Sequence, residues 1–437
     1  MSIANLDYSG LFKKVYGDKH NLLPEGFPLL KFVQTIKSGG ESHNEAVQLS
    51  HENGVSFTGE AGEIGAFEKA ADSVVKPATI KCKEIFLSSV LSTGAISNSA
   101  GGGEKAFVSA TKDRVAANTI AHNRFREHVA LYGQDNGIGR VSHITGNFRG
   151  VAFTDGSATL AGVVLTNGVN VASKIIALNP SDIASGMLQG SVGMEVELVD
   201  LSDMTIADGG DAKGTIKSVD IRNGLIKVDF DPVVSTSVSS HALLLKGQRE
   251  AKEMIGAKKI LTNTGTLFGI NGVSYDLWKG TSVAITGKLT LDKIADALEQ
   301  LCDYGLNKNV EIHISFESWK TLLKDADALR KTDASYDEKK IKRGHEAIEF
   351  FFVNGCAKIV PNRFVRRGDA FVLAEGDWKM VEVSGVGFNV PGAEGDLLVK
   401  PISTNAYTYR SYSSGQIMCL MPRRSAYISG INPESSS

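Results

Sequence analysis

Histidine is the side chain best suited to acid–base or metal chemistry near neutral pH, and this chain has nine. His122 and His128 are six residues apart, whereas two ligands on one helix face are usually about four apart. His313 stands two residues from Glu311 on an alternating segment, so this pair could face solvent together. Neither spacing completes a catalytic or metal-ligand set. We therefore interpret each histidine as structural and predict no catalytic and no metal-binding residue.

Glycine-rich segments are the next candidates, because backbone amides beside glycines can hold phosphate groups. Six residues separate Gly280 from Gly287, where a phosphate loop has about four. Leu289 then follows Lys288 in place of the Ser or Thr that such a loop requires. The G-x-G at 137–139 lacks the third glycine of a dinucleotide-binding turn, and neither a nucleophile elbow nor a zinc-protease motif occurs. The sequence accordingly predicts no cofactor and no enzyme.

Cysteine usage, charge and hydropathy limit the environment and the partners of the chain. Cys82, Cys302, Cys356 and Cys419 are far apart and include no C-x-x-C pair, so we predict reduced core residues. A formal net charge of −2 argues against a protein that holds nucleic acid tightly. There is no signal-peptide pattern and no apolar run of about 18 residues, which predicts a reducing, aqueous compartment and no membrane.

Three short charged motifs have simpler interpretations than a binding site. Arg367-Gly368-Asp369 spells an adhesion tripeptide, but it lies between two strand patterns and is predicted to be a turn. The basic clusters Lys339–Arg343 and Arg423-Arg424 are predicted to be solvated surfaces, with phosphate contact as the alternative.

The region before residue 100 combines turn formers with short apolar groups. Two prolines and a glycine within residues 22–28 prevent a continuous helix there. We predict an extended arm over residues 1–44 that lies on its own body or on a neighbour. Alternating residues in 47–57 and 78–83, with a turn signal at Asn53-Gly54, predict a β-hairpin within 45–100. Its apolar content is small. Two interpretations therefore remain open, an ordinary surface hairpin and a projecting loop.

The strongest helical signal runs from Glu104 to Tyr132, which contains no proline and no glycine. It follows a break at Gly101-Gly102-Gly103 and predicts a helix of 29 residues that ends at Gly133. One stripe recurs at spacings of three and four: Val108, Thr111, Val115, Asn118, His122, Phe125, Val129 and Tyr132. Because the stripe includes Thr, Asn and His, we expect a helix lying on a sheet, with one flank near water or a partner, rather than a coiled coil.

The rest of the chain alternates between β-rich and mixed patterns. Short strands and frequent glycines predict a small barrel or sandwich over about 150–235, followed by buried strand or turn segments at 243–245 and 267–270. Thr290 is the predicted N-cap of a helix closed by Gly305. A strand at 310–316 and a helix over 319–329 should follow, then a hairpin that pairs 348–353 with 356–360. Two further strands, 407–412 and 416–421, are expected around a turn at 413–415.

This order of parts is similar to that of tailed-phage major capsid proteins of the Hong Kong 97-type fold. The family has an N-terminal arm, an extended hairpin loop, a long spine helix in a peripheral domain, and an axial domain of sheet and helices. The resemblance implies an α+β chain with a small inserted β-barrel or sandwich. The implied division is an arm at 1–44, an extended loop at 45–100, a peripheral domain at 101–140, an insertion domain at 141–245, an axial domain at 246–375, and return strands with a tail at 376–437.

The resemblance also implies function and partners. The chain would be a structural protein of the virion, made in the host bacterial cytoplasm, that assembles as hexamers and pentamers of an icosahedral head. Because the arm begins within about 40 residues of Met1, a separate scaffolding protein is expected beside the portal. A decoration protein is a further candidate partner, and packaged double-stranded DNA would be contacted non-specifically. The alternatives are a tail-tube protein and, with less support, a β-rich hydrolase.

Overall fold

The computed structural model describes twelve parts of the chain, and every statement below concerns these residues: 26–57, 69, 72–92, 104–143, 157–160, 163–166, 173–207, 210, 212–230, 241–332, 348–388 and 406–432. The predicted start of the arm, the glycine run at 101–103, the cluster Lys339–Arg343 and the C-terminal tail lie outside them.

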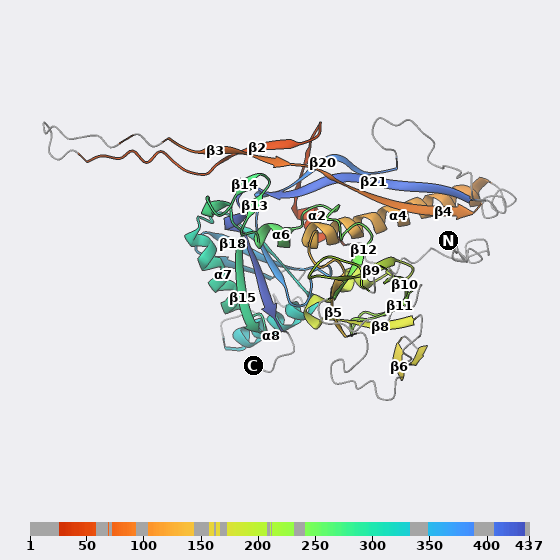
Figure 1. Ribbon diagram of the computed structural model, residues 1–437. Helices are drawn as coiled ribbons and strands as arrows, with labels where there is room; N and C mark the ends of the chain where they lie inside the picture. The colour runs from red at the N-terminus through yellow and green to blue at the C-terminus, as the bar shows by residue number, and fades with distance from the viewer. Residues whose placement is uncertain are drawn as a thin grey trace.

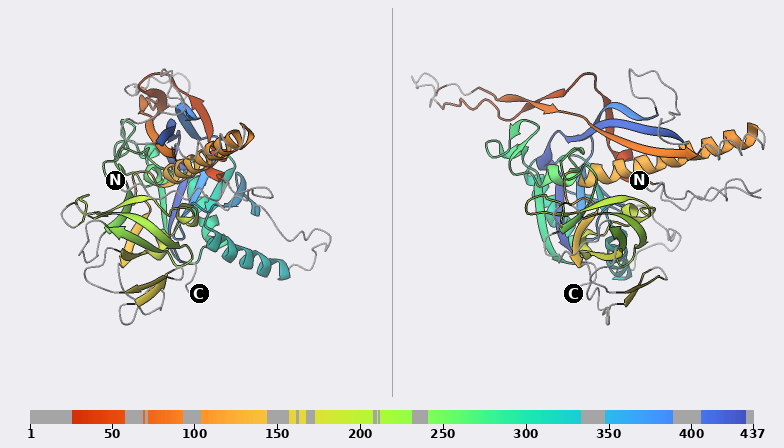
Figure 2. Two further views of the ribbon diagram at one scale, coloured as in Figure 1. Left: turned by 90° about the vertical axis from the view of Figure 1, so that its right-hand side faces the viewer. Right: turned by 45° about the vertical axis from the view of Figure 1, so that its right-hand side comes forward.

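A long helix and a projecting hairpin give the molecule its outline (Figure 1). Helix α4 (Glu104–Tyr132) has the bounds that the sequence predicts, because neither proline nor glycine interrupts it. From the body, α4 and the hairpin of β2 (His43–Gln48) and β3 (Val75–Ile80) point in opposite directions, as the right view of Figure 2 also shows. Below them lie a mixed sheet with helices and, beside it, a barrel.

Beside α4 runs a four-stranded sheet with the order β1-β20-β21-β4. Its strands are β1 (Gln34–Lys37), β20 (Trp378–Gly387), β21 (Ala406–Cys419) and β4 (Lys83–Ser92). The prediction of two strands around a turn at 413–415 is wrong, because β21 is one continuous strand. Ser414 pairs with Glu84 on one side and Ser384 on the other, so these small residues lie flat in the middle of the sheet.

The hairpin is antiparallel, with His43 opposite Ile80 and Gln48 opposite Val75. The predicted turn at Asn53-Gly54 does not join two strands, because the partner of β2 is β3 and residues 49–57 form no strand. Beyond the paired strands, the segment after β2 and the segment before β3 both continue away from the body (Figure 1). The predicted strand at 78–83 instead divides between β3 and β4, and β4 belongs to the sheet of the body.

The mixed sheet has six strands in the order β15-β22-β19-β16-β18-β17. Their bounds are β15 (Thr281–Gly287), β22 (Ala426–Ile431), β19 (Ala370–Ala374), β16 (Val310–Ile314), β18 (Gly355–Pro361) and β17 (Ile348–Phe352). The predicted hairpin across residues 354–355 is confirmed. So is the cap of α7 (Leu291–Asp303), since the Thr290 hydroxyl accepts the Lys293 N–H at 3.4 Å.

The strand predicted over 310–316 ends two residues early, at Ile314. The Ser315 hydroxyl accepts the N–H of Ser318 at 3.3 Å, and helix α8 (Phe316–Thr332) starts there. A serine that can bond backbone amides favours a helix start over a further strand residue.

Six strands close into a barrel in the order β10-β11-β8-β5-β12-β9. They are β5 (Gly139–His143), β8 (Ser173–Leu178), β9 (Glu195–Asp200), β10 (Lys213–Asp220), β11 (Leu225–Phe230) and β12 (His241–Leu245). The barrel therefore takes in β5 and β12, beyond the range 150–235 in which the sequence suggests one. That it is an insertion into a smaller fold stays a prediction.

Short elements connect these layers. They are α2 (Pro28–Phe32), β6 (Ser157–Leu160), β7 (Val163–Thr166), η2 (Pro180–Asp182), α5 (Ser185–Leu188), α6 (Ala257–Leu261), β13 (Thr266–Leu267), β14 (Ile270–Asn271), η4 (Asp276–Trp278) and η6 (Pro422–Arg424).

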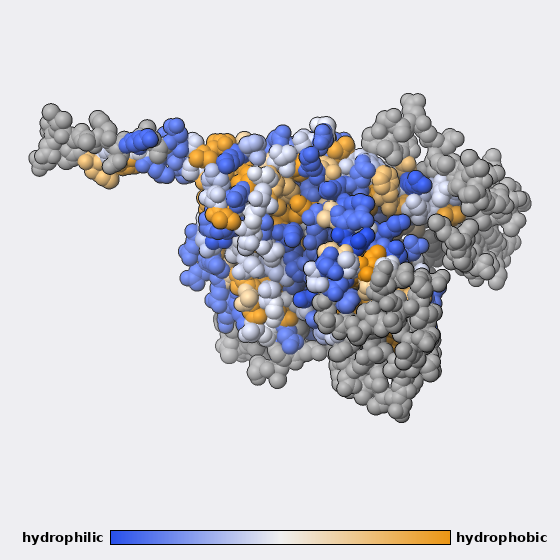
Figure 3. Space-filling model, in the orientation of Figure 1, coloured by the Kyte–Doolittle hydropathy of each residue, from blue (hydrophilic) through white to orange (hydrophobic). Residues whose placement is uncertain are grey.

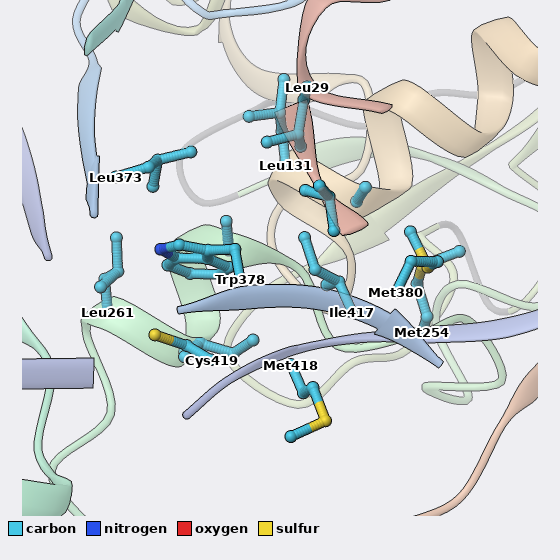
Figure 4. Packing of buried hydrophobic residues seen from close by; sticks show 14 of the residues in the cluster. Leu29, Leu131, Met254, Leu261, Leu373, Trp378, Met380, Ile417, Met418 and Cys419 are labelled. Atoms are coloured by element: carbon cyan, nitrogen blue, oxygen red, sulfur yellow. The ribbon is translucent and has the colours of Figure 1, made fainter. Parts of the chain in front are cut away.

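The central core lies where α2, the end of α4, α6 and the strands β20 and β21 meet. Trp378 stands in it beside Leu29, Leu131 and Ile417 (Figure 4). The barrel and the six-stranded sheet have separate cores. All four cysteines are free, as predicted, but only Cys419 is buried.

Two glycines allow the chain to cross the end of α4 closely. The N–H of Gly256 donates to the Gly133 carbonyl at 2.9 Å. A Cβ on Gly256 would collide with the backbone of Gly133 and Tyr132. Because Gly256 has φ −85°, the restriction is one of space and not of backbone conformation.

We predict that Gly256→Ala destabilises the subunit by about 1–3 kcal/mol or more, since the clash involves backbone that cannot rotate away. The free energy of unfolding of the unassembled chain, from urea denaturation, measures this. Gly265→Ala is the matched control, because a Cβ there meets no described atom within 4 Å, and it should change the value by less than about 0.5 kcal/mol. Equal values for the two variants would contradict the crossing.

Candidate functional site

The histidines singled out in the sequence are buried and lie apart. His313 is fully buried, so the prediction that it faces solvent with Glu311 is wrong. Strand β16 lies between β18 and β19, and the ring of Phe32 stands edge-on to His313 at 5.9 Å. Burial lowers the pKa of His313 to about 3, so the ring is neutral. Its ring lies 3.3 Å from the half-buried Glu311 carboxylate, so the two side chains share one face of β16, as their spacing predicts, but that face is covered.

His122 joins the long helix to the sheet beside it. Its two ring nitrogens contact the hydroxyls of Ser411 and Ser413 at 2.8 and 2.7 Å. Burial, with a smaller effect of the nearby Arg126 charge, lowers the pKa of His122 to about 4. One turn earlier, the Asn118 side chain donates to Ser89 Oγ on β4 at 2.9 Å. Two polar members of the helix stripe, Asn118 and His122, therefore face strands β4 and β21, which confirms the predicted sheet beside the helix.

Glu127 connects three parts of the chain that are far apart in sequence. Its Oε1 and Oε2 accept the backbone N–H groups of Leu29 and Leu30, both at 2.9 Å, at the start of helix α2. The Asn362 amide donates to Oε1, also at 2.9 Å. Burial raises the pKa of Glu127, and these three hydrogen bonds act in the opposite direction. The carboxylate thus replaces the missing cap of α2, since Phe27 offers no side-chain cap.

Next to Glu127 lies a buried ionic cluster around Arg366. Its guanidinium contacts Asp135 at 2.5 Å and lies over the Tyr132 ring at 4.1 Å. Lys258 joins Asp135 at 3.1 Å, and Tyr427 donates to Asp369 at 2.6 Å. These residues come from the end of α4, from α6, from β22 and from the turn before β19. We call Glu127 and this cluster the polar joint.

The Arg367-Gly368-Asp369 tripeptide belongs to that turn, as predicted, and the N–H of Gly368 donates to the Ser181 carbonyl at 2.8 Å. Asp369 is buried inside the polar joint. A buried carboxylate cannot be presented to an adhesion receptor, so the interpretation as a turn holds.

Arg140 on β5 and Asp182 in η2, the turn that follows β8, form a charged pair within the barrel segment. Two guanidinium nitrogens of Arg140 donate to Asp182 at 2.7 and 3.0 Å, and the backbone N–H of Arg140 donates at 2.9 Å. Burial acts to raise the pKa of Asp182, but the bonds from Arg140 outweigh it and lower the pKa to about 2. This charged pair therefore ties β5 to the turn that follows β8, and it persists across ordinary pH. That turn meets the segment before β19 through the backbone, where the N–H of Arg367 donates to the Ile183 carbonyl at 3.2 Å.

The polar joint does not resemble a reactive centre. Its carboxylates are matched by hydrogen-bond donors or cations from other segments. Within the described parts of the chain, no three His, Cys, Asp or Glu side chains are grouped so as to hold a metal ion. In the same parts, no helix is both long and apolar enough to cross a membrane. The cluster acts on structure, because it fixes the arm helix α2, helices α4 and α6 and the six-stranded sheet to one another.

The projecting hairpin is the second feature with functional potential. Among its described residues, Leu49, Ala78 and Ile80 are buried, whereas Val55 is 64% and Phe57 95% exposed. Figure 3 shows the hairpin clear of the body, where apolar and polar surface are interspersed. Apolar side chains on a thin projection gain burial only against another molecule. The described part of the hairpin thus exposes apolar groups away from the body.

Comparison with known proteins supports this architecture. No protein-family model and no curated protein matches the chain. Among solved structures, the fold is similar to that of the cyanophage A-1(L) capsid asymmetric unit, with 11% identity, 96% of each chain covered and a TM-score of 0.52. This likeness shows the fold, and it confirms the capsid fold implied by the order of parts.

Two further similar structures have lower scores. A chain of Mycobacterium phage Bobi has 8% identity, with 99% of this chain and 100% of that chain covered and a TM-score of 0.43. The capsid of an empty GTA particle has 10% identity, with coverage of 95% and 96% and a TM-score of 0.42.

Sequence reasoning missed Glu127 and Arg366. The available signal was indirect: Phe27-Pro28 has the proline of a first helical turn but no Ser, Thr, Asp or Asn before it. Such a helix needs a cap from elsewhere, and only the structure shows that Glu127 supplies it.

We predict that Glu127→Ala destabilises the subunit by at least about 3 kcal/mol, because three donors lose their acceptor in a buried place. Urea denaturation of the unassembled chain measures the loss. Glu299→Ala, an exposed change on another helix, is the control and should shift stability by less than about 0.5 kcal/mol. If the two variants unfold at the same urea concentration, the carboxylate is not a cap.

The pH dependence of stability tests His122. Its folded pKa lies below the unfolded value of 6.5, so the unfolded chain binds the proton first and stability falls as pH drops from about 6.5 toward 4. Relative to His122→Asn, the wild-type protein should lose about 2 kcal/mol of stability between pH 7.5 and pH 5. Denaturation curves at both pH values measure the difference, and a difference that does not change with pH would show that folding does not lower the pKa of the ring.

Proposed function

We propose that this chain is the major capsid protein of a tailed bacteriophage, a structural subunit that assembles as hexamers and pentamers of an icosahedral head around double-stranded DNA. The observation that supports this proposal most strongly is the fold, which is similar to a cyanophage capsid structure over 96% of the chain. A hairpin without a core of its own and a rigid body with a long helix are the parts that such a shell needs.

Physical properties support assembly in many copies. A formal net charge of −2 limits repulsion between closely packed subunits and favours only loose, non-specific contact with DNA. A hairpin that leaves one subunit and lies on the next makes a head-to-tail contact. Head-to-tail contacts close into rings when the rotation between copies fits.

The proposal extends to place and partners. The protein would be part of the virion after synthesis in the host cytoplasm, would carry no enzymatic activity, and would meet a portal and a separate scaffolding protein. The domain division given from the sequence belongs to the proposal, with the barrel as an insertion domain that offers a surface for a decoration protein.

Shortening the hairpin tests the proposal. A deletion of 55–78 would remove part of β3, including the buried Ala78, so residues 51–73 are the better choice. Leu49 N–H already donates to Val74 O at 2.7 Å, and an Asn-Gly turn can close the chain there. We expect a subunit that stays folded but forms no closed shell, as seen by negative-stain electron microscopy.

The unmodified chain is the reference for that experiment, and circular dichroism and urea denaturation show whether the shortened chain is folded. Normal shells from the shortened chain would contradict the proposal that the hairpin is needed to close the shell. Tubes or stacked rings from the unmodified chain would contradict the capsid assignment and favour a tail-tube protein.

A further inference from the structure

A pocket of about 280 Å³ lies where the arm helix α2 and strand β1 meet helix α4 and strand β20. Phe27, Leu30, Val33 and Met380 are its apolar lining. A dry apolar cavity of about 150 Å³ accepts a benzene molecule. The pocket therefore has room for a phenyl ring together with a small neighbouring group.

The polar lining of the pocket is largely satisfied from within. The guanidinium of Arg126 forms an ion pair with the Glu382 carboxylate, and both side chains are nearly buried, at 11% and 13% exposure. A ligand with a strong charge of its own would find these two groups already paired. What is left to bind is apolar, with one exposed cation, Lys31, also among the lining residues.

The hairpin carries a group of matching chemistry. Phe57 is 95% exposed, the most exposed large apolar side chain in the described parts, and Val55 beside it is 64% exposed. Glu52, also exposed, precedes them and has the charge opposite to that of Lys31. One segment of seven residues, 51–57, thus combines an aromatic group, a small apolar group and an acid.

The hairpin cannot reach the pocket of its own subunit. Its strands leave the body at β2 and β3 and continue away from α2 and α4 (Figure 1 and the right view of Figure 2). Phe57 lies nine residues beyond the last paired residue of β2. An intramolecular contact would need the hairpin to fold back over its base, so the occupant must belong to another copy.

We infer that the pocket between α2, β1, α4 and β20 binds Phe57 of a second copy of this chain, with Val55 beside the ring and Glu52 near Lys31. This rests on the proposed function and names the surface on which the hairpin lies. The contact is head-to-tail, with a projecting aromatic on one copy and a preformed pocket on the next, so it sets the direction in which copies follow one another around a ring.

Cross-linking within assembled particles tests the inference. Thr35 also lines the pocket and is exposed, so Phe57→Cys combined with Thr35→Cys places two thiols near each other only across the proposed contact. A short bismaleimide should then link most subunits into covalent chains on a denaturing gel. The matched control pairs Phe57→Cys with Thr286→Cys, an exposed threonine on β15 in the other sheet, and should give at least ten times less product.

Two substitutions test the chemistry of the contact. Phe57→Asp should reduce the yield of closed particles at least tenfold, while Phe57→Leu, which keeps an apolar group, should stay within about twofold of the unmodified chain. Val192→Asp, at a 61% exposed valine on the loop before β9, controls for an added surface charge and should assemble normally.

The outcomes separate this inference from the proposed function. Two results would overturn the pocket contact and leave the capsid assignment standing. The first is a normal yield of closed particles from Phe57→Asp. The second is a yield of cross-linked product from Phe57→Cys with Thr35→Cys that is no higher than that of the control pair. Failure of the unmodified chain to form closed particles under any assembly condition would contradict the proposed function and the inference together.

Discussion

The carboxylate of Glu127 holds together parts of the chain that no local signal would bring to one place. It caps an arm helix of five residues that is too short to be stable alone, and it also receives the amide of Asn362. A buried carboxylate is costly unless several donors surround it, so α2 and the turn at Asn362 must be in place whenever Glu127 is charged. The position of the arm, and with it the base of the hairpin, follows from this one group.

The rest of the polar joint extends the same constraint. Helix α4 passes from a half-exposed stretch near Val115 to an end where Glu127 through Tyr132 are buried on all sides. A helix end surrounded in this way needs polar partners as well as apolar ones, and Arg366 and Asp135 provide them. Buried ion pairs contribute little net stability, but they penalise any other arrangement of their partners, so we attribute to them the fixed angle between helix α4 and the six-stranded sheet. A subunit that transmits forces around a shell needs such rigidity.

Much of this fold was open to sequence reasoning, for identifiable reasons. The bounds of α4 and the cap at Thr290 are local properties, set by the lack of proline and glycine and by one hydroxyl. The continuous strand β21 was missed, because small residues at 413–415 have the composition of a turn and become a strand only by pairing on both sides. His313 was misplaced for the same reason: an alternating pattern does not show that both faces of β16 are covered. In these cases the structure depends on partners that are far away in the sequence. The same holds for Glu127, whose role as the cap of α2 depends on a helix almost 100 residues earlier.

The central claim is that the chain builds a shell in which each hairpin lies on the next subunit. An electron cryomicroscopy map of particles assembled from the unmodified chain measures this directly. The account predicts closed particles with the hairpin of β2 and β3 extended over the arm helix and long helix of a neighbouring copy. A hairpin packed against its own subunit, or an assembly without closed shells, would contradict it.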